Sequence, residues 1–449
     1  MSWRAAGVAA VVLGLLAACG SSSPSSGATA DEGPLRLLTH EDFPLDDSVV
    51  AELEAATGEP VVVVVEEDQA SMLDLLTASS AGSGIDVVVG LDSLSVGTAL
   101  SARLFDEYAP AGSDLLDPSL RVEGDPVVPV SSTDACFNYD RTWFRPPEEA
   151  TDDEGAPPTT AAPENQDEVL DAADVINQGG QLGPATTVTG EAGDDQAAAG
   201  EGETGSGDGA DEGTADAAGL AARPAAPSSL EALSGEEYAG LVAFPDPEAD
   251  RLALAFVAGL GGQTAGPPEP GVPDPELVSR LRDLRANDLR ITPTFRDAYF
   301  GEFTAGAADG QRPVVLASAL MPAVTARFLD PIPPVLQTAV IPDGCTRLVS
   351  YSGILADSAR PEAARRLLDA IVAPEFQFAM SDARGSRPAR TDLIRRPEVA
   401  AFDPSVEPLL LDPATSAAKV PDLLLAWLAA GTPTAEEADI GATSTTGDE

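Results

Sequence analysis

Thiol and imidazole groups, which many enzymes use for covalent and acid–base chemistry, are few in this 449-residue chain. It has three cysteines and one histidine. A serine hydrolase would need His40 as its base, yet no Gly-x-Ser-x-Gly turn supplies the nucleophile. The phosphate-binding Gly-x-x-x-x-Gly-Lys loop is missing, and one histidine among scattered carboxylates shows no zinc-ligand spacing. Paired carboxylates, as glycosidases use, carry no signal among 74 acidic residues. We therefore expect no enzyme, no cofactor and no metal.

The first cysteine, Cys19, ends a segment that is typical of bacterial export signals. Arg4 precedes an apolar run, residues 5–18, which is shorter than the roughly 20 residues that span a bilayer. The run ends in Leu-Ala-Ala-Cys-Gly, which resembles the lipobox of lipoproteins, where the cysteine is lipidated and becomes the first residue. We expect a signal peptide and lipidated cysteine at 1–19, a flexible tether at 20–33, and a protein anchored by lipid at the extracytoplasmic membrane face. An ordinary signal peptide with a chance cysteine is the alternative.

The other two cysteines, Cys136 and Cys345, remain for a disulfide once Cys19 is assigned to the lipid. Export would place both thiols in an oxidising compartment, where such a bond persists. Two buried free thiols are the alternative.

The charge of the chain excludes one class of partner. The formal net charge is −49, with only 25 basic residues. A nucleic-acid surface needs clustered Lys and Arg, so we expect no nucleic-acid partner.

A long acidic segment interrupts the globular sequence. Residues 148–220 contain 19 acidic residues and no Lys, Arg or aromatic residue. Such a composition cannot bury enough apolar surface to offset its chain entropy. We predict a disordered insertion over 148–222 with the role of a solvated spacer, and Ca²⁺ capture is the alternative. The polar tail, 432–449, is also predicted to be disordered.

The rest of the chain alternates strand-like and helix-like segments. Apolar runs at 35–39, 61–65 and 85–89 predict strands, and the five valines at 61–65 predict one that is buried on both faces. Helical spacing of apolar residues follows at 47–57 and 71–79. This order indicates an α/β fold. The other expected elements are strands at 127–130, 135–139, 241–244 and 314–318, extended segments around 340 and 348–350, and helices at 94–104, 252–260, 274–286 and 361–371.

Several segments, in the same order along the chain, resemble ABC-importer solute-binding proteins with two α/β lobes and a hinge. They cover most of the sequence outside the signal, the insertion and the tail. The segments are Phe105–Pro110 after Gly90-Leu91-Asp92, then Cys136–Asp140, Ser229–Leu233, Tyr238–Val242, Asp246-Pro247, Ser352–Leu355 and Ala359–Leu368, and last Ala373–Gln377.

Within that class the chain is most similar to thiamine-binding proteins. Segment 86–92 looks like their Ala-Asp-Val-Val-Leu-Gly-Leu-Asp, and 295–299 looks like their Trp-Ser-Glu-Ala-Tyr. The strand at 313–318, followed by Pro322, is similar to the one that leads into their Ser-Tyr-x-x-Ser-Pro.

Two segments and two single residues depart from the thiamine-binding pattern. His-Glu-Asp-Phe at 40–43 replaces Tyr-Asp-Ser-Phe, and the segment from Asp246 to Ala253 lacks the hydroxyls that would hold a phosphate or hydroxyethyl group. Phe295 replaces a ligand Trp, and Ser318 falls where a ligand Tyr is expected. A thiazolium cation requires aromatic faces and a carboxylate, for which Glu41 and Phe295 are the candidates.

The resemblance implies a two-lobed periplasmic-binding-protein type II fold with hinge strands near 129–139 and 338–350. Lobe 1 would comprise 34–130 and 340–431, and lobe 2 would comprise 131–147 and 223–339. A monomer would close on a small solute, such as thiamine or a related cationic heterocycle, and deliver it to an ABC permease. A lipoprotein scaffold with a vestigial cleft is the alternative. The implied ligand contacts are His40, Glu41, Asp92, Asp246, Phe295, Tyr299 and Ser318.

Overall fold

The computed structural model describes residues 33–78, 83–124, 126–144, 223–326, 331, 335–381, 385–393 and 400–432. The predictions for Cys19 and the signal peptide, for the tether, for the acidic insertion and for the tail beyond Thr432 lie outside these residues.

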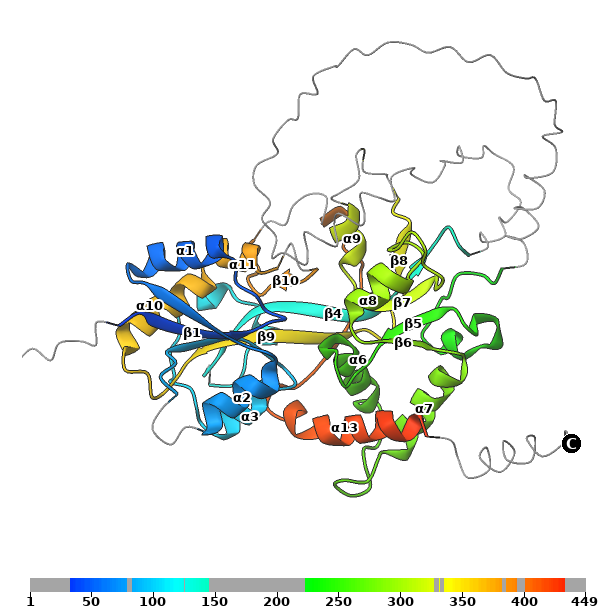
Figure 1. The fold of residues 1–449 in the computed structure, drawn as a ribbon, viewed down its shortest axis with the longest axis horizontal. Coiled ribbons are helices and arrows are strands. Elements are labelled where there is room, and N and C mark those ends of the chain that lie inside the picture. Colours follow the sequence, from blue (N-terminus) through cyan, green and yellow to red (C-terminus); the bar gives the residue numbers. More distant parts are fainter. Residues whose placement is uncertain are drawn as a thin grey trace, which may run out of the picture. The chain divides into compact units, whose positions relative to one another are not determined.

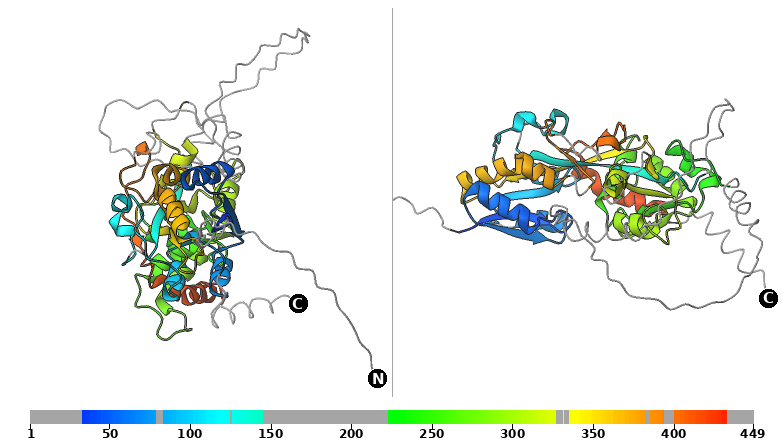
Figure 2. Two further views of the ribbon diagram at one scale, coloured as in Figure 1. Left: turned by 90° about the vertical axis from the view of Figure 1, so that its left-hand side faces the viewer. Right: turned by 90° about the horizontal axis from the view of Figure 1, so that it is seen from above.

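The first lobe is built on three parallel strands, β1 (Leu35–His40), β2 (Val61–Glu66) and β3 (Val87–Asp92), in the order β2-β1-β3. The crossover from β1 to β2 through α1 (Asp47–Thr57) runs opposite to that from β2 to β3 through α2 (Gln69–Ala78). Right-handed crossovers therefore place α1 and α2 on opposite faces of the sheet (Figures 1 and 2).

The predicted helices and strands of this lobe are present, but the predicted burial of β2 is wrong. Helix α1 has the predicted bounds and ends at Gly58, whose φ is 72°. Strand β3 is buried throughout, but β2 is not, because it lies at the edge of the sheet, where one side of the strand faces solvent. Val65 is consequently 54% exposed, so the prediction of burial on both faces is wrong for 61–65.

Two long strands join the lobes. We predicted separate strands at 127–130 and 135–139, but the structure has one continuous strand there, β4 (Val128–Asp140). Over residues 128–135 this strand pairs with β9 (Thr346–Ile354), and from Ala135 onward it pairs with a strand of the second lobe. Strand β9 pairs in turn with β3 of the first lobe. The expected pair of hinge strands is therefore present as two antiparallel neighbours (Figure 1).

The second lobe continues the sheet through β7 (Val314–Ser318), β5 (Val242–Pro245) and β6 (Arg290–Thr292). Its helices α6 (Arg251–Gly261) and α7 (Pro275–Ala286) bury apolar faces that the spacing predicted. The rings of Phe137, Phe244 and Phe256 contact one another in its core. The remaining helices and strands of the described residues are α3 (Val96–Ser101), α8 (Phe295–Asp297), a π-helical turn (Ala298–Glu302), α9 (Met321–Ala326), β8 (Thr338–Val340), α10 (Pro361–Val372), α11 (Pro374–Ala379), β10 (Arg387–Pro388), β11 (Leu409–Leu410), α13 (Ser416–Ala430) and 3-10 turns at Ser113–Leu115, Pro118–Leu120, Glu231–Ser234 and Glu236–Tyr238.

The last helix, α13, belongs to the second core, although we expected residues 340–431 in the first lobe. It packs along α6 and α7 (Figure 1). The Trp427 ring stacks on Phe244 with centroids 5.5 Å apart, and the guanidinium carbon of Arg285 lies over the Trp427 ring, 3.6 Å from its centroid. Burial of this large aromatic surface fixes α13 on the second lobe. Among the described residues, no helix combines the length and apolar character needed to cross a membrane.

Candidate functional site

The carboxyl ends of β1 and β3 lie beside the start of α6 in the second lobe. His40 and Asp92 are the last residues of their strands, and Arg251 is the first residue of α6. In open α/β sheets, ligands bind beyond the carboxyl ends of strands. This edge is the candidate site.

The His40 ring is 3% exposed and contacts the neighbouring strand. Its Nε2 lies 3.1 Å from the carbonyl oxygen of Gly90, and therefore carries the proton that it donates there. Burial lowers the pKa of His40, which favours the neutral ring. Its Nδ1 is a buried acceptor without a hydrogen-bond partner in the structure. The site thus contains a neutral imidazole with one lone pair unused.

Gly90 makes this close approach of β3 to His40 sterically feasible. Its φ is 99°, and a Cβ atom on it would lie 2.9 Å from Cγ of Phe43 and 3.2 Å from Nε2 of His40. A side chain at this position would collide with both rings.

Three exposed carboxylates lie near His40 and form what we call the acidic rim: Glu41 is the next residue in the chain, and Asp42 and Asp68 interact electrostatically with His40. The turn after β1 carries Glu41, whose N–H donates to Glu66. Asp68 precedes α2 and accepts from the Ser71 N–H at 2.7 Å, which lowers the pKa of Asp68. Burial raises the pKa of Asp250 and lowers that of Arg296 in the second lobe, and the charge of Asp42 adds a smaller upward contribution to the pKa of each. The rim therefore acts electrostatically on the second lobe.

The carboxylate of Asp92 is fully engaged by the protein itself. Its Oδ1 accepts from Leu94 N–H at 2.8 Å and from Arg251 Nη2 at 2.6 Å. Its Oδ2 accepts from Gln69 Nε2 at 2.9 Å and from Arg251 Nε at 2.8 Å. Four donors fill the roughly four acceptor positions of a carboxylate. In this state Asp92 is 1% exposed and has no acceptor position left for a solute.

Asp250 positions Phe295, and our sequence predictions missed it. It is the N-cap of α6, accepting from the N–H groups of Leu252 and Ala253 at 2.9 and 3.0 Å. Its second oxygen accepts from the Phe295 N–H at 2.7 Å. Burial raises the pKa of this carboxyl to about 6. An Asp directly before an apolar helix is an N-cap signal that would have identified it.

The other predicted contacts are buried or bind protein groups, and the buried Tyr299 hydroxyl has no hydrogen-bond partner in the structure. Asp246 accepts from the Trp427 indole at 3.0 Å and so holds α13 in place. Tyr299 is 0% exposed, and burial raises the pKa of its hydroxyl to about 12. Ser318 is 3% exposed, donates to the Gly385 carbonyl and accepts from Leu320 N–H. The structure therefore brings His40, Glu41 and Asp92 to one edge, links Phe295 to it through Asp250, and directs Asp246, Tyr299 and Ser318 elsewhere.

A shallow pocket of about 660 Å³ lies beside this site on the second lobe, between β6 and the π-helical turn. Its lining includes Arg296, Phe300 and Glu302. Among the residues that the structure describes, no three His, Cys, Asp or Glu side chains form a group that could hold a metal ion.

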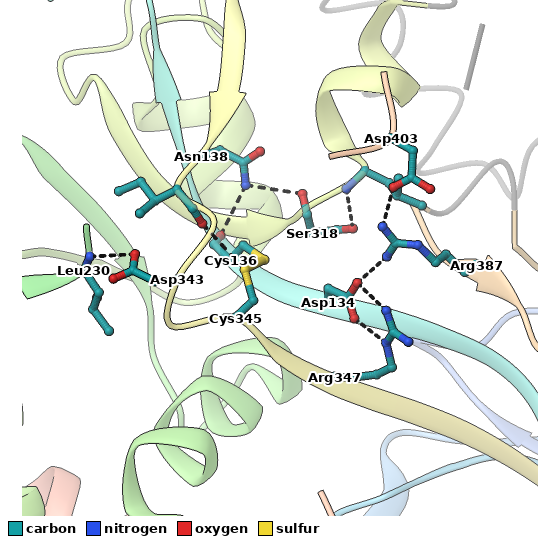
Figure 3. The surroundings of a disulfide bond; sticks show 12 residues. Asp134, Cys136, Asn138, Leu230, Ser318, Asp343, Cys345, Arg347, Arg387 and Asp403 are labelled. Atoms are coloured by element: carbon teal, nitrogen blue, oxygen red, sulfur yellow. Dashed lines mark hydrogen bonds and ion pairs between the residues drawn. A yellow bond between two sulfur atoms is a disulfide. The ribbon is translucent and has the colours of Figure 1, made fainter. Parts of the chain in front are cut away.

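The predicted disulfide between Cys136 and Cys345 is present, with Cα atoms 4.6 Å apart (Figure 3). It lies where β4 stops pairing with β9 and starts pairing with β7. Two residues before Cys136, the buried carboxylate of Asp134 accepts from Arg347 at 2.6 and 2.9 Å and also pairs with Arg387. The structure therefore excludes the alternative of two free thiols. The disulfide links β4 to the start of β9 at the hinge.

Comparisons with known proteins give structural neighbours only. No family model and no curated protein matches the sequence. Iron-bound HitA from Pseudomonas aeruginosa matches with a TM-score of 0.54 at 14% identity, over 89% of this chain and 100% of that one. A periplasmic thiamin binding protein matches at 0.55 and 18%, over 89% and 96%. A ferric binding protein from Campylobacter jejuni matches at 0.56 and 11%, over 88% and 99%. At identities this low, the structural matches show the fold alone. It is the expected type II periplasmic-binding-protein fold.

Proposed function

We propose, from a fold that this chain shares with periplasmic iron- and thiamin-binding proteins, that it is an extracytoplasmic solute-binding protein of an ABC importer. It captures a small molecule between its lobes, closes by hinge rotation, and presents the closed form to a membrane permease. Its role is binding without bond chemistry. The observation that carries this proposal is the pair of shared strands, β4 and β9, which connect two separately packed cores.

The solute that this site suits best is thiamine or a related cationic heterocycle. The acidic rim of Glu41, Asp42 and Asp68 attracts a cation to the open edge of the first lobe. Phe295, held by Asp250, supplies an aromatic ring from the second lobe, and the Arg296 guanidinium already lies over that ring, 5.7 Å from its centroid. His40 is only 3% exposed, so its unused Nδ1 lone pair can accept from an amino group of the solute only once the site opens.

Membrane attachment through Cys19 completes the proposal, because a tethered binding protein stays beside its permease. Replacing Cys19 by Ser should release the protein from the membrane fraction. Mass spectrometry should find a diacylglycerol adduct on Cys19 of the native protein, and an unmodified thiol there would refute the anchor.

A second candidate function is an envelope scaffold with a vestigial cleft. The burial of Tyr299 and Ser318 and the engagement of Asp92 by Arg251 favour it, since three expected ligand contacts serve the fold instead.

A thermal-shift screen separates the two functions. The mature protein is tested against thiamine, thiamine phosphates, polyamines, ferric citrate and sugars. A ligand at 100 times its Kd stabilises the folded state by about 2.7 kcal/mol. We expect thiamine or a related cation to raise Tm in the wild type and to raise it less in Glu41→Gln and Phe295→Ala. Glu276→Gln, an exposed change on α7, is the matched control. A screen without any shift would favour the scaffold.

A further inference from the structure

One ion pair joins the two lobes at the edge of the candidate site. Asp92 ends β3 of the first lobe, and Arg251 begins α6 of the second. The Arg251 guanidinium grips the carboxylate with Nε and Nη2 at 2.8 and 2.6 Å, and Nη2 also donates to Ser95 Oγ at 2.7 Å. This fork geometry is the strongest form of a charge-assisted hydrogen bond.

Each half of the pair is bound to a candidate solute contact. Gly90, two residues before Asp92, accepts the hydrogen bond of His40. Asp250, directly before Arg251, accepts the N–H of Phe295. The ion pair therefore sets how far the His40 side of the site lies from the Phe295 side.

The pair can separate without stranding either charge. When Arg251 leaves, Asp92 keeps the two hydrogen bonds that it exchanges with Gln69, which lies in the first lobe. The Arg251 side chain is already 27% exposed, whereas Asp92 is 1% exposed, so the guanidinium is the half that water reaches first. The capping bonds of Asp250 to α6 and to Phe295 stay within the second lobe. Separation of the lobes at this edge would therefore break the ion pair and leave these other hydrogen bonds of Asp92 and Asp250 within their own lobes.

We propose that the Asp92–Arg251 ion pair is a latch that holds the lobes in the arrangement seen here and must break before they separate. This inference rests on the hinge movement of the proposed function, but not on the identity of its solute. Arg251 is accordingly a positioning residue, and it places a built-in cation on the carboxylate that a solute cation would otherwise contact. Recognition of a cationic solute then falls to the acidic rim.

The latch is tested on the full-length protein by double electron–electron resonance. Spin labels attached through non-thiol chemistry at the exposed residues Glu52 in α1 and Asp283 in α7 report the distance between the lobes without touching the disulfide. In the absence of solute, Arg251→Gln should increase the ratio of long to short distances about tenfold or more, because a hydrogen-bonded charge pair is lost. Arg251→Lys, which keeps the charge but not the fork, should give an intermediate ratio.

Two further variants make the result decisive. Arg280→Gln removes the exposed pair with Glu276 on α7 and should leave the distribution unchanged. Asp92→Asn removes the other charge of the pair, so it tests the latch if Arg251→Gln does not fold. A folded Arg251→Gln or Asp92→Asn protein with the wild-type distance distribution would overturn the latch. Because no solute is present, a failed ligand screen leaves this outcome unaffected, and the two proposals fail separately.

Discussion

Asp250 is expected to make the stability of the protein depend on pH in an unusual direction. Burial raises the pKa of this carboxyl from 3.8 to about 6 in the folded state, despite three backbone N–H donors. The folded state therefore binds more protons than the unfolded state between these two values. Under that condition the free energy of unfolding falls as pH rises. The stabilisation is complete below about pH 4 and is lost as pH passes through 6.

The pKa difference corresponds to about 3 kcal/mol, since each unit is worth about 1.4 kcal/mol. Replacing Asp250 by Asn keeps one oxygen for the α6 N-cap and removes the titration. The new NH₂ group faces the Phe295 N–H, which costs about 1–3 kcal/mol at every pH. The variant should be less stable than the wild type at pH 4 and about equal to it at pH 7.

Urea denaturation at half-unit steps from pH 4 to pH 7 measures this difference. The free energy of unfolding of Asp250→Asn relative to wild type should rise by about 2–3 kcal/mol across the range. Asp46→Asn, which alters the N-cap of α1, controls for loss of a cap. Parallel curves for wild type and Asp250→Asn would refute the reasoning, because they would show that the carboxyl does not titrate between the two states.

Three other predictions follow from the same region and from the hinge. Because the chain has a single histidine, NMR can titrate His40 directly, and the midpoint should lie below pH 6.5. The contribution of His40 to the free energy of unfolding is lost as pH falls below 6.5, because the ring of the unfolded chain then binds more protons than the folded one. A Gly90→Ala protein should be destabilised by about 1–3 kcal/mol in urea, because its Cβ collides with Phe43 and φ stays positive; a wild-type midpoint would contradict this. Joint replacement of Cys136 and Cys345 by Ser should cost about 2–5 kcal/mol in the same assay, since the bond closes a loop with a sequence separation of 209 residues; unchanged stability would show that the crossing holds without it.

Regular elements were predictable wherever one local pattern decided them. Helix α1 and strand β7 have the predicted bounds, because apolar spacing, a cap and flanking turns agree there. The prediction that the five valines of β2 are buried on both faces was wrong for a different reason. A run of apolar residues does not show whether its strand lies in the centre or at the edge of a sheet. Helix α13 was missed because its partners, Phe244 and Arg285, are distant in sequence.

The candidate site was predictable only in part. The resemblance to solute-binding proteins implied His40 and Asp92 as ligand contacts, and the structure places both at one edge because the sheet topology brings the carboxyl ends of β1 and β3 together. Nothing local showed that Arg251, 159 residues further on, would occupy Asp92. Likewise, Tyr299 and Ser318 are buried because they pack against segments that are distant in sequence, and no local pattern predicts such contacts.

Isothermal titration calorimetry of the mature protein with thiamine tests the central claim most directly. We predict saturable binding with one site per chain, weakened at least tenfold in Glu41→Gln and in Phe295→Ala. A flat titration with thiamine and with every other cationic heterocycle tried, on protein whose fold is intact by circular dichroism, would contradict the assignment of this site to a cationic solute.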